Sequence, residues 1–162
     1  DSVASRGLGD VYKRQLITPA DRIEVEGLPV CDYLVYPVES ALADKLCALV
    51  ERHDRRASSR VKDLVDIAVY AVTCSIDGGK LRERVLQEGA LRGIALPETF
   101  CIPDEWGAPH ERQYERLCSQ TGLPHSLWSI DASVELAGKL FNPVYAGFAD
   151  AMTWNPVTRE WE

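Results

Sequence analysis

The stretch that decides the fold is PVESALADKLCALVERHDRRASSRVKDLVDIAVY, residues 37–70. Two segments with apolar residues at helical spacing flank a short basic loop, which predicts a pair of helices. The apolar stripe of the first helix consists of Val38, Ala41, Leu42, Leu46, Ala48 and Leu49. Its polar face is expected to carry Ser40, Asp44, Cys47 and Glu51.

Two cations, Lys45 and Arg52, lie within this apolar stripe. Burying an unpaired ammonium group is costly, so each side chain must either extend its head to solvent or meet an anion. The first helix therefore carries two cations that need either solvent or an anion.

The second helix has a buried stripe of its own, made of Val61, Leu64, Val65, Ala68, Ala71 and Val72. Ser58 or Ser59 is expected to cap its first turn. Polar residues occupy the opposite arc, namely Lys62, Asp63, Asp66 and Tyr70.

The polar residues of the two helices form one candidate cluster: Lys45, Arg52, Arg60, Lys62, Asp63 and Asp66. Such a set offers cations for phosphate and carboxylates for metal or base chemistry. A plain structural role is the alternative. In that case Asp63 favours a helix N-terminus, Lys62 and Asp66 form a surface pair, and the remaining cations reach solvent.

The other predicted elements alternate between strands and helices. Strands are expected at residues 22–25 and 32–36, helices at 80–92, 109–120 and 131–150, and a hairpin at 153–161. The helix at 80–92 is expected to point Leu81, Val85, Leu86 and Ala90 inward, and Asn142-Pro143 should kink the last helix.

Composition limits the possible functions. The chain has 162 residues, 46% of them hydrophobic, which suits one core. A net charge of −7 argues against a protein whose entire surface binds nucleic acid. There is no long apolar run, so no membrane contact is expected. The five cysteines form no C-x-x-C pair, which argues against zinc and predicts reduced thiols in the cytoplasm.

Residues 1–15, DSVASRGLGDVYKRQ, differ in composition from the rest. They resemble the translation of sequencing-adapter DNA at the broken end of a gene, so residues 1–15 are expected to be a non-native or disordered segment. A flexible natural tail is the alternative. Residues 16–162 then form the domain.

Three short motifs carry a family resemblance: YPVE at residues 36–39, ADKL at 43–46 and SRVKDLVDI at 59–67. In order and spacing they resemble the AbiEii/AbiGii-type nucleotidyltransferase toxin family, whose pattern is roughly Y-P-x-E-x-x-x-A-E-K-L-x-A-L followed by S-R-x-K-D-x-x-D. Asp44 stands where the family usually has Glu. Phe100, Pro103, Trp106, Trp154 and Trp161 also fit.

The resemblance implies a polymerase-β-like enzyme that transfers a nucleotide from an NTP to an RNA, tRNA or protein acceptor with Mg²⁺. It also implies the toxin of a type IV toxin–antitoxin or abortive-infection system, with a possible cognate antitoxin as partner. The fold is expected to be α+β and mainly helical here, with remnant short amino-terminal strands.

The resemblance also assigns roles to residues. It implies that Lys45 and Arg52 face the triphosphate, and that Arg60 and Lys62 are supporting cations. Asp63 and Asp66 are implied as acidic partners that act either as a base or by orienting these cations.

The family's metal-binding motif, a Gly-Ser turn followed by paired carboxylates, has no counterpart here, because Asp21, Glu24 and Glu26 do not follow such a turn. We therefore expect a carboxyl-terminal portion that lacks these carboxylates and is inactive alone. The alternative is a non-catalytic helical module that binds a protein partner. Exposed aromatic anchors would then be Trp106, Trp128, Trp154 and Trp161.

Overall fold

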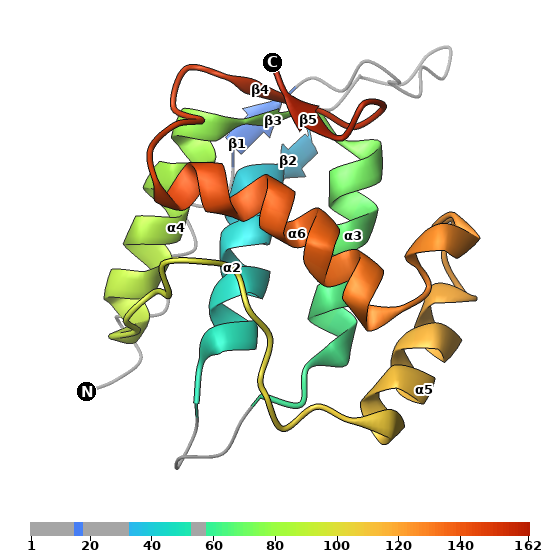
Figure 1. The fold of residues 1–162 in the computed structure, drawn as a ribbon. Coiled ribbons are helices and arrows are strands. Elements are labelled where there is room, and N and C mark those ends of the chain that lie inside the picture. Colours follow the sequence, from blue (N-terminus) through green and yellow to red (C-terminus); the bar gives the residue numbers. More distant parts are fainter. Residues whose placement is uncertain (1–14, 18–32, 53–57) are drawn as a thin grey trace.

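The computed structural model describes residues 15–17, 33–52 and 58–162, and this part of the chain is α+β and mainly helical, as predicted (Figure 1). A 3₁₀ turn at His125–Leu127 precedes the last helix. The helices are α2 (Val38–Val50), α3 (Val61–Thr73), α4 (Gly78–Arg92), α5 (Ala108–Cys118) and α6 (Ile130–Tyr145).

The described strands form two small antiparallel sheets. Strand β1 (Gln15–Ile17) pairs with β2 (Tyr33–Val35), which confirms the strand predicted at 32–36. The second sheet has the order β3-β4-β5, with bounds Ile76–Asp77, Thr153–Asn155 and Glu160–Trp161. Strands β4 and β5 are the predicted hairpin. The strand predicted at 22–25 lies outside the described residues.

Helix α2 lies between α4 and α3 and is buried on almost every side (Figure 1). Ser40 and Cys47 are only 3% and 0% exposed, so the polar face predicted for this helix is wrong at both positions. The reason is α4, which packs along that side of α2. The remaining acidic residues there, Asp44 and Glu51, form ion pairs with Arg92 of α4 at 3.1 and 3.2 Å.

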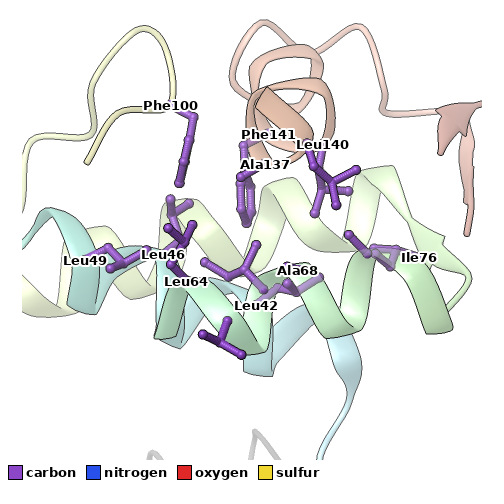
Figure 2. Close-up of a cluster of buried hydrophobic side chains, with 14 of the residues drawn as sticks. Leu42, Leu46, Leu49, Leu64, Ala68, Ile76, Phe100, Ala137, Leu140 and Phe141 are labelled. Atoms are coloured by element: carbon purple, nitrogen blue, oxygen red, sulfur yellow. The ribbon is translucent and has the colours of Figure 1, made fainter. Parts of the chain in front are cut away.

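The core forms where α6 crosses over α2 and α3 (Figure 2). Leu42, Leu46 and Leu64 of the lower layer are fully buried. From above, the ring of Phe141 packs into this layer and stacks on Phe100 with ring centroids 5.6 Å apart. Each large apolar side chain removed from water contributes roughly 1.5–3 kcal/mol to folding, so this contact holds the three helices together.

The ends of α2 and α4 differ from the predictions. Helix α2 ends at Val50, which leaves Arg52 beyond the helix. Helix α4 begins at Gly78 because the Oδ1 atom of Asp77 accepts a hydrogen bond from the Lys80 amide at 2.8 Å and caps the first turn.

The inward face predicted for α4 is half correct. Leu81 and Val85 are buried, as predicted, but Leu86 is 52% exposed and Ala90 is also exposed, so both were wrongly placed. Gly89 lies inward instead, because Leu96 of the following loop packs closely over it.

The tryptophans serve the fold rather than an open surface. Trp154 is fully buried, so its predicted exposure is wrong; Trp106, Trp128 and Trp161 are partly buried. Every indole N–H donates to a backbone carbonyl, including Trp154 to Ala71 at 2.8 Å and Trp106 to Ser58 at 2.6 Å. These hydrogen bonds connect the carboxyl-terminal hairpin to α3 and α6, and the loop before α5 to the segment before α3. None of the helices in the described part of the chain has the length and apolarity needed to cross a membrane.

Candidate functional site

The charged residues predicted on the two helices meet at the interface of α2 and α3. The Nζ atom of Lys45 lies 2.6 Å from Oδ2 of Asp66 and 3.5 Å from Oδ1 of Asp63. From the α3 side, Arg60 Nε lies 2.7 Å from Oδ2 of Asp63, and Lys62 Nζ lies 2.7 Å from Oδ2 of Asp66. We call these five residues the α2–α3 charge cluster.

The cluster has a buried interior and an exposed rim. The side chain of Asp63 is 8% exposed, and those of Lys45 and Asp66 are 22% and 23% exposed. Arg60 and Lys62 are far more open, at 62% and 70%. With three cations and two carboxylates the cluster carries one excess positive charge, and its two exposed cations lie on the solvent side.

Local sequence explains this geometry. Asp63 and Asp66 are one turn apart on α3, so both carboxylates reach the same side of the helix. Lys45 lies one turn after Ala41 on α2, where that helix faces α3. The ammonium within the apolar stripe therefore pairs with an anion, Asp66, which is one of the two outcomes that the sequence left open.

Asp63 departs from the sequence prediction, which placed it on a solvent-facing arc. Its Oδ2 atom is buried and accepts no hydrogen bond within the described residues, although it forms an ion pair with Arg60. Arg60 itself occupies the N-cap position of α3, with its amide donating to Oγ of Ser58 at 3.3 Å. The N-cap of α3 is therefore Arg60, and the prediction of Ser58 or Ser59 in this role is wrong.

Charge states in the cluster follow from its contacts. Burial opposes the charged form of Lys45, but hydrogen bonds and charge interactions with Asp66 and Asp63 outweigh burial and raise the pKa of Lys45. Burial also opposes the charged form of Asp66, and the hydrogen bonds from Lys45 and Lys62 outweigh it, so the pKa of Asp66 is lowered. Both groups are therefore ionised at neutral pH.

Arg52 occupies a different neighbourhood from the α2–α3 charge cluster. Its side chain is 52% exposed and its Nη2 atom lies 2.6 Å from Oε1 of Glu105, in the loop before α5. It borders a cavity of about 240 Å³ together with Leu49, Ser58 and Cys101. Five of the six predicted residues therefore lie together in the α2–α3 charge cluster. The sixth, Arg52, forms an ion pair with Glu105 instead.

The carboxylates of the cluster do not fit a magnesium ion. A hard cation such as Mg²⁺ needs several free oxygen ligands. Here Asp63 and Asp66 are occupied by Lys45, Arg60 and Lys62. Across residues 15–17, 33–52 and 58–162 no group of three or more His, Cys, Asp and Glu is arranged to hold a metal.

A second charge cluster was not predicted from the sequence. Arg92 bridges Glu88 on its own helix, at 2.7 Å from Nε, to Asp44 and Glu51 near α2. Hydrogen bonds and charge interactions with Glu88 and Asp44 outweigh burial and raise the pKa of Arg92. The spacing of Glu88 and Arg92 by one helical turn was a signal that the sequence offered. Their partners Asp44 and Glu51, however, were predicted to lie on the polar face of the first helix.

Comparison with known proteins gives one family. The model of that family, described as nucleotidyl transferase AbiEii toxin of a type IV toxin–antitoxin system, matches residues 6–136. The match includes residues 6–15 of the segment set aside in the sequence analysis, and all of α2 and α3. Searches of curated proteins and of solved structures gave no match. The chain belongs to the AbiEii nucleotidyl transferase toxin family, which is associated with type IV toxin–antitoxin systems.

Proposed function

We propose that this protein is a polymerase-β-like nucleotidyltransferase toxin that transfers a nucleotide from an NTP to an RNA, tRNA or protein acceptor, and that the α2–α3 charge cluster binds the triphosphate. In this reaction the acceptor oxygen bonds to the α-phosphorus, pyrophosphate leaves, and the acceptor proton passes to solvent. Membership of the AbiEii family supports the class of reaction. The charges of the α2–α3 charge cluster support its assignment as the triphosphate site.

The observation that carries the proposal is the excess positive charge of the cluster. Arg60 and Lys62 are exposed, so they can turn toward a phosphate without unfolding either helix. Lys45 lies behind them with a raised pKa, which keeps its ammonium charged at neutral pH. Charge-assisted hydrogen bonds from such groups are strong and suit the charge of a triphosphate.

Of the two roles expected for the carboxylates, orientation of the cations fits better than proton transfer. A general base works best when its pKa is near the working pH, and the pKa of Asp66 is lowered by Lys45 and Lys62. Asp63 and Asp66 are therefore proposed as positioning residues. Arg52 is proposed as an outer phosphate contact, which requires it to leave Glu105.

Magnesium, when bound, would neutralise charge on the triphosphate, and we propose that carboxylates outside the described residues hold it. The cluster's own carboxylates are paired with cations and cannot serve. Because its sequence has no Gly-Ser turn followed by paired carboxylates, this 162-residue chain alone is expected not to label tRNA, RNA or protein from a radioactive NTP. Labelling by the purified chain would overturn this part of the proposal. We propose that the reaction takes place in the cytoplasm, where NTP is available and where a cognate antitoxin would counter it.

The phosphate site is tested by NTP titration of the chain, followed by NMR or calorimetry. Lys45→Met and Lys62→Met should each weaken NTP binding by roughly ten- to a hundredfold, the effect of losing one charge-assisted hydrogen bond. Lys139→Met is the matched control, because Lys139 is 60% exposed and pairs only with Glu135 one turn away.

The Lys62→Met variant separates a loss of NTP binding from a loss of folding. Lys62 is 70% exposed, so its replacement should leave the free energy of unfolding unchanged. Unaltered NTP affinity in both the Lys45 and the Lys62 variants would remove the cluster from the nucleotide site. The helical module that binds a protein partner would then be the better function.

A further inference from the structure

A cavity of about 370 Å³ lies between α6, the 3₁₀ turn before it and the carboxyl-terminal hairpin. Leu127, Ala132 and Leu136 form the apolar part of its wall. The volume lies within the usual range of small-molecule sites. None of its lining residues belongs to the α2–α3 charge cluster, so this cavity is separate from the proposed nucleotide site.

Four charged side chains also line the cavity, and two of them balance each other. The Nζ atom of Lys139 lies 3.3 Å from Oε1 of Glu135, one turn away on α6. The other two, Arg159 and Glu160, form no ion pair and no side-chain hydrogen bond in the described part of the chain. A cation and an anion that do not pair with each other therefore line one small cavity.

The backbone of Arg159 indicates that its side chain has a use. Among the described residues, Arg159 is the only non-glycine residue with a positive φ, at 57°. This left-handed conformation costs roughly 1–2 kcal/mol for a residue with a Cβ atom, and glycine is the usual choice there. The turn is fixed by Asn155, whose carbonyl oxygen accepts from the Arg159 amide at 2.8 Å. An arginine in a strained position beside a cavity supports a binding role for its guanidinium.

The charges around the cavity select the kind of ligand. The four charges sum to zero, so a simple anion or a simple cation meets as many like charges as opposite ones. A zwitterion, in contrast, can use both unpaired groups at once. Positions 159 and 160 are consecutive, with Cα atoms about 3.8 Å apart, which suits a ligand whose two charges are close together.

We infer that this cavity binds a free α-amino acid with an apolar side chain. The guanidinium of Arg159 binds the carboxylate of the ligand, in the paired geometry that guanidinium and carboxylate groups favour. The carboxylate of Glu160 binds the ammonium group. The side chain of the ligand packs on Leu127 and Leu136, which are each 5% exposed in the unliganded structure.

The test compares three probes that share one ring: L-phenylalanine, phenethylamine, which lacks the carboxylate, and 3-phenylpropanoate, which lacks the ammonium. Each is added to the isotope-labelled full chain and followed by NMR. Phenylalanine should shift the amide signals of Leu127, Leu136 and Thr158 at millimolar concentration. Each of the other probes should bind roughly three- to tenfold more weakly, because it loses one charge-assisted contact near solvent.

Two variants assign the charges to the two ends of the ligand. Arg159→Gly should weaken phenylalanine binding roughly three- to tenfold and abolish the preference for phenylalanine over phenethylamine. Glu160→Gln should have a similar effect on affinity and abolish the preference over 3-phenylpropanoate. Arg112→Gln is the control, because Arg112 is exposed on α5 and does not line the cavity.

Arg159→Gly also separates binding from folding. Glycine adopts a positive φ without strain, so this variant should unfold at the same temperature as the parent or higher. The inference is overturned if phenylalanine leaves the cavity signals unshifted, if either single-charge probe binds as well as phenylalanine, or if either variant keeps the affinity of the parent. These outcomes leave the nucleotide proposal untouched, since NTP titration addresses other residues.

Discussion

The ammonium of Lys45 links two helices through carboxylates that the sequence places eighteen and twenty-one positions later. Helical spacing was enough to show that this cation must either reach solvent or meet an anion, and the second helix offered Asp63 and Asp66 as candidates. Spacing could not show that Asp63 is buried, because a wheel of one isolated helix omits α2, whose Lys45 Nζ atom lies 3.5 Å from Oδ1 of Asp63. The charge states of these groups make the helix pair sensitive to pH.

Asp66→Asn should lower the free energy of unfolding by about 1–3 kcal/mol at neutral pH, since Lys45 then keeps a weaker partner in a half-buried place. Because the pKa of Asp66 is lowered in the folded state, its contribution is present above its ordinary pKa of 3.8 and is lost as the pH falls through the folded value. The difference between parent and variant should therefore shrink in acid. Urea unfolding at neutral and acidic pH measures it.

Lys45 should make the free energy of unfolding depend on pH in the opposite direction, at alkaline pH. Its pKa is raised, so its contribution to stability is present below pH 10.5 and is lost as the pH rises through the folded value.

The control for Asp66→Asn is Glu115→Gln, on an exposed part of α5, whose free energy of unfolding should match that of the parent at each pH. Equal stability of Asp66→Asn and the parent at neutral pH would show that the ion pair contributes nothing to folding.

At the scale of elements, the helices could be predicted because apolar residues recur at helical spacing along each one. Their ends and outer faces could be predicted less well. Helix α2 was expected to have a polar face, and α4 covers that face with Arg92 as a shared partner. The first residue of α4 must be glycine because of a contact with a distant segment: a Cβ atom added at Gly78 would lie 1.9 Å from the carbonyl oxygen of Ala149.

Gly78→Ala should therefore destabilise the fold by about 1–3 kcal/mol or more, since the clash is with backbone and cannot be relieved by a flexible side chain. Gly122→Ala is the matched control, because an added Cβ there meets nothing within 4 Å. Thermal unfolding followed by circular dichroism compares the two variants. A Gly78 variant as stable as the Gly122 variant would mean that α4 and the segment after α6 are not packed as described.

At the scale of the molecule, the α+β class and the carboxyl-terminal hairpin were predictable, whereas the pairing of that hairpin with β3 was not. Strand β3 has two residues, too few for a local pattern, and its partner Trp154 is far along the chain from Ile76. Long-range pairing of this kind depends on how α3, α4 and α6 fit together. The same distance hid the fact that Trp154 belongs to the core rather than to an interface.

Trp154→Ala should cost about 3–5 kcal/mol of unfolding free energy, because it removes a fully buried ring and its hydrogen bond to Ala71. Trp161→Ala should cost clearly less, because Trp161 is only partly buried, although it stacks edge-on against Trp154 with ring centroids 5.5 Å apart. Urea unfolding of both variants gives the comparison. Equal losses would contradict the proposed difference in burial.

The late position of β4 in the chain has a consequence during synthesis. When the ribosome has made α2, α3 and α4, the edge of β3 and the place that Trp154 will fill over α3 are still uncovered, because residues 153–161 come only after α6. A nascent chain stalled before residue 153 should therefore expose apolar surface and attract chaperones, and translation past the hairpin should release it. The core is therefore completed only after the hairpin has been made, when the Trp154 indole donates its hydrogen bond to the carbonyl of Ala71 on α3.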